Sequence, residues 1–190
     1  LTLVTVTFNS RHTLCDTINS VLQQTYPYIE YIIIDGASTD NTVGAIKQYE
    51  HDFNGRLRWI SEKDDGLYDA MNKGFSMATG DVIGIINSDD VLADPAAIEK
   101  VVKCFERDET IDAVYADLYY VAQNDISKIV RHWVSGEQRS FAKGWHPAHP
   151  TFYVKKEVYH KYGAFDLDFK FAADFELMLR LIEKLSLIHI

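Results

Sequence analysis

Two adjacent carboxylates, Asp89 and Asp90, follow an apolar run in the stretch IINSDDVL at residues 85–92. Neighbouring like charges repel, and each ionised carboxylate resists losing its water. A divalent cation such as Mg²⁺ or Mn²⁺ removes this repulsion, because it prefers oxygen ligands and keeps positions open for substrate phosphates. The pair therefore indicates a metal site that receives a diphosphate. A simple turn capped by the two side chains is the alternative.

Three other apolar runs in the first half of the chain also end in polar residues. These ends are Phe8-Asn9-Ser10, Asp35-Gly36 and the stretch 61–65. Helical periodicity separates the runs, so we expect strand–helix repetition and a parallel sheet covered on both faces. Ligands of such sheets bind beyond the carboxyl ends of the strands, so the four polar ends predict one shared site. The predicted strands are 1–8, 28–35, 57–61 and 81–87, and the predicted helices are 11–24, 41–50, 67–78 and one beginning at Asp94-Pro95.

The pattern changes after residue 112. Two β-rich runs, 113–122 and 128–134, are separated by turn-forming residues and predict a hairpin. A loop at 143–150 follows, then a short strand at 151–154 and a helix that ends at Gly163. We expect a last helix from about 172 to the end of the chain. The fold class is therefore α/β, with a mostly parallel sheet and a small antiparallel hairpin.

Length and charge restrict the function. The 190 residues fit a single domain, and the net charge of −9 argues against a nucleic-acid surface. No apolar run is long enough for a membrane span. Cys15 and Cys104 match no zinc spacing and are expected to be reduced thiols of a cytoplasmic protein. Leu1 opens directly into a predicted core strand, so we expect the natural start to lie upstream.

Glycine-rich phosphate loops are absent. The sequence contains neither GxGxxG nor GxxxxGK[ST], which argues against a nicotinamide enzyme and a P-loop ATPase. Metal chelation by Asp89 and Asp90 is the remaining way to hold a phosphate.

Five motifs occur in the order and spacing of a known family. Together they resemble the inverting family 2 glycosyltransferases of the GT-A fold, which use nucleoside diphosphate sugars, and above all the bacterial enzymes of capsule, exopolysaccharide and O-antigen synthesis. The motifs are TVTFNS at 5–10, IIIDGASTDNT at 32–42, GLYDAMNKG at 66–74, GDVIGIINSDD at 80–90 and AADFELMLRL at 172–181.

The resemblance implies a nucleotide site in residues 1–112. By position, Thr7, Asn9 and Asp35 would hold the nucleotide, and Asp65 would contact the base or ribose. Asp89 would lie near the ribose and the metal. Many relatives have a second carboxylate after the one at Asp35, where this chain has glycine, so the identity of the nucleotide stays open.

The resemblance also implies the catalytic groups. Asp90 would be the direct ligand of Mn²⁺ or Mg²⁺, and Asp174 would be the catalytic base. Asn87 stands where many relatives have aspartate, but the metal-binding position is retained. Arg180 is expected to pair with a carboxylate as a structural group.

Three further residues are candidate substrate contacts, each with a structural alternative. Asp69 would contact the sugar, or form a salt bridge with Lys73 one helical turn away. Trp145 would stack on a sugar ring, or be a buried anchor. His149 would contact the substrate, with loop packing as the alternative, and its neighbour His146 raises the same question.

The sequence thus predicts a metal-dependent inverting transferase that moves a hexose, from UDP in the first instance, to a glycan or lipid-linked acceptor in surface polysaccharide synthesis. Residues 113–190 would form the acceptor side and continue beyond Ile190. We expect a cytoplasmic protein, with peripheral attachment to the inner face of the membrane left open. A nucleotidyltransferase and a non-catalytic nucleotide-sugar-binding module are the alternatives, and only the enzyme requires Asp174.

Overall fold

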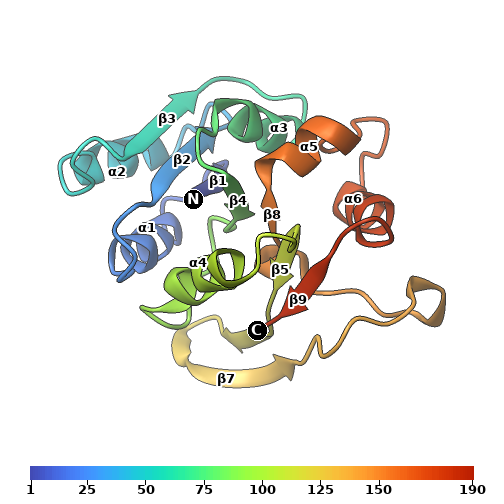
Figure 1. Cartoon of the computed structure of the whole chain (residues 1–190). Coiled ribbons are helices and arrows are strands. Elements are labelled where there is room, and N and C mark those ends of the chain that lie inside the picture. Colours follow the sequence, from blue (N-terminus) through green and yellow to red (C-terminus); the bar gives the residue numbers. More distant parts are fainter.

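The computed structural model describes residues 1–190 and contains a seven-stranded sheet with the order β3-β2-β1-β4-β8-β5-β9 (Figure 1). The first four strands in this order are mutually parallel, so their carboxyl ends lie along one edge. This confirms the mostly parallel sheet that strand–helix repetition predicts. These strands are β1 (Thr2–Thr7), β2 (Glu30–Asp35), β3 (Leu57–Ser61) and β4 (Val82–Ile85).

The second half of the chain completes the sheet with short strands. β8 (Tyr153–Lys155) pairs antiparallel with both β4 and β5 (Ala113–Tyr115), and β9 (Leu187–His189) pairs parallel with β5. β6 (Leu118–Ala122) and β7 (Asp125–Trp133) form the predicted antiparallel hairpin as a separate two-stranded sheet. Figure 1 shows β7 at the bottom of the view, away from the main sheet.

Helices cover both faces of the sheet, because neighbouring strand residues point to opposite faces. Val4, Ile32 and Ile83 contribute to one core, while Leu3, Ile33 and Val82 contribute to the other. The first core is covered by α3 (Leu67–Met77), α5 (Lys156–Tyr162) and α6 (Ala173–Ile182). The second is covered by α1 (Leu14–Leu22), α2 (Thr42–Tyr49) and α4 (Ala97–Arg107).

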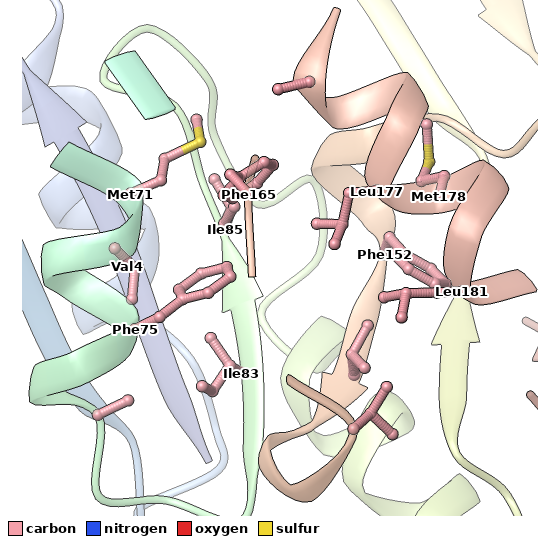
Figure 2. Close-up of a cluster of buried hydrophobic side chains, with 14 of the residues drawn as sticks. Val4, Met71, Phe75, Ile83, Ile85, Phe152, Phe165, Leu177, Met178 and Leu181 are labelled. Carbon is pink, nitrogen blue, oxygen red and sulfur yellow. The ribbon is translucent and has the colours of Figure 1, made fainter. Parts of the chain in front are cut away.

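The first core joins the two halves of the chain. Figure 2 shows Met71 and Phe75 of α3 on one side and Leu177 and Leu181 of α6 on the other, with Phe165 between the two helices. Helix α3 also packs tightly on the central strand: a Cβ atom on Gly74 would lie 2.3 Å from a methyl carbon of Val4. The position of α6 is therefore tied to α3 and to the parallel sheet.

Three expectations about local structure are wrong. The predicted strand 113–122 is two strands, β5 and β6, with a break before Leu118. The last helix does not run to the end of the chain: α6 ends at Ile182, and β9 follows at the sheet edge. The helix expected to begin at Asp94-Pro95 begins at Ala97 as α4, because the Asp94 carboxylate accepts the backbone N–H of Ala96 in a turn before it.

The longest helices, α3 and α4, have eleven residues each. None of the helices combines the length and the apolar character that crossing a bilayer requires.

Candidate active site

The loops after β1 and β2 are joined by two hydrogen bonds of Asn9. Asn9 has a left-handed backbone conformation, with φ of 51°, which asparagine tolerates better than most residues. Its backbone N–H donates to Ser38 Oγ at 2.7 Å, and its side-chain oxygen accepts the N–H of Thr39 at 2.8 Å. Asn9 thus fixes the shape of the sheet edge at which the first two strands end.

Thr7 and Asp35 are the last residues of β1 and β2 and are partners in the parallel register. Thr7 is 5% exposed and Asp35 is fully buried. Thr7 Oγ1 and Asp35 Oδ1 are the two buried side-chain atoms in the protein that have no hydrogen-bond partner. Native proteins leave few such atoms, because each one costs about 1–3 kcal/mol. Both of these unsatisfied atoms belong to residues that the family resemblance assigns to nucleotide binding.

The other carboxylate oxygen of Asp35 organises the edge. Asp35 Oδ2 accepts the backbone N–H of Ser38 at 3.0 Å and the hydroxyl of Ser61, the last residue of β3, at 2.6 Å. Asp35 therefore connects the loop after β2 to the end of β3. Beside it, Gly36 lies against the third strand end, since a Cβ there would approach Asp64 Oδ2 to 3.2 Å.

Lys73 forms ion pairs with three carboxylates near the connection between β3 and α3. Its ammonium lies 2.9 Å from Glu62, 2.5 Å from Asp64 and 3.3 Å from Asp69. Hydrogen bonds that Lys73 donates to Asp64 first, and then to Glu62, raise the pKa of Lys73. The salt-bridge alternative for Asp69 is therefore present in the structure.

The side chains of Asp65 and its neighbour Asp64 differ in their exposure to solvent. The side chain of Asp65 is exposed, and its backbone N–H donates to Asp69 Oδ2 at 3.1 Å. Asp64 instead has its carboxylate 8% exposed, beside Gly36. Sequence reasoning selected Asp65 and did not single out Asp64. Two adjacent acidic residues give no signal about which one turns toward the sheet.

The loop after β4 holds the acidic pair. Asn87 donates from Nδ2 to Asp90 Oδ2 at 2.8 Å, while Asp89 is exposed. Burial raises the pKa of Asp90, the Asn87 hydrogen bond opposes this shift, and the charge of Asp89 adds to it. Ser88 Oγ donates to Ser10 Oγ at 3.1 Å, which brings this loop to the end of β1. Asn87, noted in the sequence as a departure, therefore orients the carboxylate of Asp90.

The carboxylates after β4 suit a metal ion for which the substrate supplies further ligands. No three acidic, histidine or cysteine side chains gather into a group that could hold an ion unaided. Mg²⁺ and Mn²⁺ sites of phosphate-handling enzymes commonly use one or two carboxylates together with substrate phosphate oxygens. Asp90, with one oxygen held by Asn87 and Asp89 beside it, fits that chemistry.

Asp174 lies in the first turn of α6 and meets the first turn of α3. Tyr68 donates its hydroxyl to Asp174 Oδ1 at 3.1 Å. Burial, followed by the negative charge of Asp174, raises the pKa of Tyr68, so the phenol stays a donor at neutral pH. Because α3 begins after the five-residue loop 62–66 that follows β3, this contact brings Asp174 toward the edge at which the parallel strands end.

His149 packs beside this pair. Its ring lies edge-on to Phe165, with 5.7 Å between the ring centroids, and Phe165 stacks on Tyr68 at 5.2 Å. Burial lowers the pKa of His149, and the charge of Asp174 opposes that shift. His149 is thus within the electrostatic reach of Asp174, and its neighbour His146 instead packs against Trp133 and Phe175.

Trp145 is half-buried among aromatic side chains. Its indole N–H donates to the carbonyl oxygen of Ser135 at 2.8 Å. Its ring meets those of Tyr115 and Phe141 edge-on, at 5.7 and 5.8 Å. These contacts are those of an anchor for the loop before β8.

Arg180 has the structural role expected of it. Its Nε donates to Glu176 at 2.7 Å, one helical turn away, and its terminal nitrogens donate to the carbonyl oxygens of residues 162–164. The guanidinium therefore holds α6 against the segment that leads to Phe165.

The family model and the similar proteins agree on one family. The model of "Glycosyl transferase family 2" matches residues 2–166. An uncharacterized glycosyltransferase of Mycobacterium tuberculosis is 31% identical over 184 residues, covering 95% of this chain and 68% of that protein. A PGL/p-HBAD biosynthesis glycosyltransferase of Mycobacterium bovis is 24% identical over 178 residues, covering 90% of this chain and 65% of that protein.

Solved structures share the fold over the whole chain. S. aureus TarS 1–349 in complex with UDP has a TM-score of 0.76 at 16% identity, and this chain covers 57% of it. Mannosyltransferase PcManGT from Pyrobaculum calidifontis, in complex with GDP-Man and Mn²⁺, has a TM-score of 0.75 at 20% identity, with 54% covered. The chain thus spans little more than half of these two proteins, and at these identities the likeness shows the fold.

Proposed function

Because the chain belongs to glycosyl transferase family 2, we propose that it transfers a sugar from a nucleoside diphosphate to an acceptor hydroxyl. Its sheet and helices have the GT-A arrangement of the glycosyltransferase structures that it resembles. The expectation of a glycosyltransferase is confirmed at the level of the family. The roles of individual residues, the metal and the substrates are proposed below.

One observation carries the placement of the nucleotide. Thr7 Oγ1 and Asp35 Oδ1 are buried and without a hydrogen-bond partner, and their residues are partners in the strand register. The loops that carry Asn9 and Asp90 lie at the same edge. A nucleotide brings N–H and O–H donors together with acceptors, so it would satisfy atoms that the protein leaves unsatisfied. We place the base and ribose over the ends of β1, β2 and β3, with Asp64 and Asp65 at the rim.

Asp90 would be the direct ligand of the divalent metal, with Asp89 near the metal and the ribose. The metal would supply positive charge that offsets the charge growing on the leaving diphosphate. A Mn²⁺ ion accompanies GDP-Man in the mannosyltransferase of similar fold, which supports this choice of cation class. Of this chain's own residues, Asn87 keeps the Asp90 carboxylate oriented through the hydrogen bond to Oδ2.

Asp174 would be the general base. It would take the proton of the acceptor hydroxyl as that oxygen attacks the anomeric carbon, and the bond between the anomeric carbon and the diphosphate oxygen would break. A single displacement from the opposite face inverts the anomeric configuration. Asp174 lies in the first turn of α6, at the helix end that carries partial positive charge.

For the substrates we propose a hexose carried by UDP, with a glycan or a lipid-linked saccharide as acceptor in surface polysaccharide synthesis. The TarS structure with UDP supports the nucleotide, and the complex of the mannosyltransferase with GDP-Man makes GDP the alternative. Asp69 and His149 would line the sugar and acceptor side, and Trp145 would anchor the loop that borders it. We place the reaction in the cytoplasm, with attachment to the inner face of the membrane as a further option.

A panel of UDP- and GDP-sugars tests this function without knowledge of the acceptor. The protein is incubated with each sugar and Mn²⁺ or Mg²⁺, and release of the nucleoside diphosphate to water is measured. We expect slow hydrolysis of one or a few donors that stops when EDTA is added. The absence of both hydrolysis and binding across the panel would overturn the proposal, and binding without turnover would favour the non-catalytic module.

A further inference from the structure

Helix α3 presents two functional faces. Asp69 and Lys73, one turn apart, face the loop after β3, where Asp69 accepts the backbone N–H of Asp65. Tyr68, Asn72 and Phe75 follow one another at helical spacing and face the second half of the chain. The same helix therefore contacts the proposed donor site with one face and the proposed base with the other.

Asn72 fixes the chain segment that leads to α6. Its side-chain Nδ2 donates to the carbonyl oxygen of Phe165 at 2.9 Å, and its Oδ1 accepts the N–H of Phe165 at 3.0 Å. This pair of bonds satisfies the backbone of Phe165 as a strand neighbour would. Arg180 holds the preceding residues 162–164 from the side of α6. The backbone of residues 162–165 is thus held by side chains of both helices.

Tyr68 connects α3 to α6 through its side chain. Its ring stacks on Phe165, with centroids 5.2 Å apart and planes at 30°, and its hydroxyl reaches Asp174 Oδ1. This is the one hydrogen bond that the Asp174 carboxylate makes within the protein. Figure 2 shows Phe165 between the two helices. The ring of Tyr68 therefore stacks on a residue that is itself packed in the core. Oδ2 of Asp174 is left for a proton from outside the protein.

We propose that Tyr68 is a positioning residue, whose hydroxyl holds Asp174 Oδ1 so that Oδ2 faces the acceptor as the proton-accepting atom. This inference rests on the proposed function, in which Asp174 is the base. The hydrogen bond restricts the Asp174 side chain to one orientation. Through α3, the orientation of the base is tied to the helix that borders the donor site.

Tyr68→Phe separates the hydroxyl from the ring, because phenylalanine keeps the stack on Phe165. The first readout is the ¹³C chemical shift of the Asp174 carboxyl group by NMR at pH 7, assigned with Asp174→Asn, which needs no substrate. Loss of the donor should change this chemical shift, because Oδ1 no longer accepts the hydrogen bond. Tyr49→Phe is the matched control: Tyr49 is also half-buried in a helix, and its hydroxyl accepts a hydrogen bond from Asn19, far from the site. It should leave the chemical shift unchanged.

The second readout is turnover of the donor that the wild type hydrolyses. We expect kcat to fall about tenfold in Tyr68→Phe with KM for the donor unchanged. Tyr68→Leu removes the stack as well and should also lower the midpoint of urea unfolding, which Tyr68→Phe should leave within error. An unchanged Asp174 chemical shift, or an unchanged kcat in an active enzyme, would overturn the inference. A wild type that turns over no donor while the Asp174 chemical shift changes in Tyr68→Phe would overturn the proposed function and leave the orienting hydrogen bond established.

Discussion

Thr7 and Asp35 are register partners at the ends of the two central parallel strands, and each buries one side-chain oxygen that has no hydrogen-bond partner. The rest of the edge is well satisfied: Asp35 Oδ2 has two donors, and Asn9 uses both its backbone and its side chain. Unmet hydrogen-bonding capacity is thus concentrated at the point where an α/β sheet binds its ligand. This concentration favours a binding role for the pair over a purely structural one.

The first prediction concerns Thr7→Val, which replaces the unsatisfied hydroxyl with a methyl group of similar size. The free protein should gain stability, by about 1 kcal/mol, because a buried polar atom without a partner is removed. Its affinity for UDP should fall several-fold, because the atom that the nucleotide would satisfy is gone. Urea unfolding and isothermal titration calorimetry with UDP and Mn²⁺ measure the two effects.

Thr5→Val is the matched control on the same strand. Thr5 Oγ1 hydrogen-bonds Tyr31 Oη at 3.0 Å and donates to the carbonyl oxygen of Ile86 at 2.8 Å. That substitution should therefore destabilise the protein, by about 1–3 kcal/mol, with UDP affinity retained. Equal loss of stability in both variants would contradict the distinction drawn between the two threonines.

The second prediction concerns the metal. Asp90→Ala should reduce the Mn²⁺-dependent part of UDP binding by tenfold or more, because the remaining carboxylate, Asp89, is exposed and held by no other side chain. Asp81→Ala is the control, since Asp81 is an exposed carboxylate directly before β4, at the amino end of that strand. Equal calorimetric affinities for Asp90→Ala and the wild type, with Mn²⁺ present, would refute the assignment.

The third prediction concerns the packing of α3 on β1. A Cβ at residue 74 would lie 2.3 Å from Val4, which is sub-van der Waals contact in a close-packed core. Gly74→Ala should therefore destabilise the protein by about 1–3 kcal/mol although alanine is the better helix former. Ser76→Ala, on the exposed side of the same helix, should change the free energy of unfolding by less than about 0.5 kcal/mol. A stabilised Gly74→Ala variant would mean that the helix sits farther from the strand.

The fourth prediction concerns pH. The pKa of Glu30 is lowered to about 2, because burial is outweighed by hydrogen bonds from Thr2, the backbone of Thr79 and Arg58. A carboxyl group whose pKa is lower in the folded state stabilises the protein above its unfolded pKa of about 4.5. That contribution is lost as the pH falls from about 4.5 to about 2.

Glu30→Gln should accordingly cost about 2 kcal/mol at pH 7 and much less at pH 2.5, as measured by urea unfolding at both values. Glu109→Gln, an exposed carboxylate whose side chain accepts no hydrogen bond, is the comparison and should cost little at either pH. An equal loss at pH 7 and pH 2.5 for Glu30→Gln would show that its charge has no part in the stability.

The parallel half of the fold could be predicted because its signals are local. Apolar runs of strand length end at Asp35 and near Asp90, and helical periodicity between them requires the crossovers that make a sheet parallel. The alternation of Leu3 and Val4 toward opposite cores follows from the same pattern. The shared edge of strand ends was predictable for this reason, since parallel strands bring their ends together whatever lies between them.

Features that depend on distant partners were not predictable. The break between β5 and β6 falls at Asp117, whose carboxylate accepts the N–H of Ser135 and contacts His189, and local alternation continues through the break. β9 is a strand because it pairs with β5 more than seventy residues earlier, although its apolar sequence is equally compatible with a helix. Tyr68 has the spacing of a core stripe, so its hydroxyl contact with Asp174 is visible only once α3 and α6 meet.

The central claim is that Asp174 removes the proton from the acceptor, and Asp174→Asn tests it most directly. Asparagine keeps the size of the side chain and an oxygen that accepts the Tyr68 hydroxyl, and it removes the proton acceptor. Asp168→Asn, an exposed aspartate in the loop before α6, is the control. The measurement is the single-turnover rate with the preferred donor at saturating metal, alongside calorimetric binding of the nucleoside diphosphate. We predict unchanged binding in both variants and a rate reduced about 10²-fold or more in Asp174→Asn alone. A wild-type rate in Asp174→Asn would contradict the account and assign the base to another group.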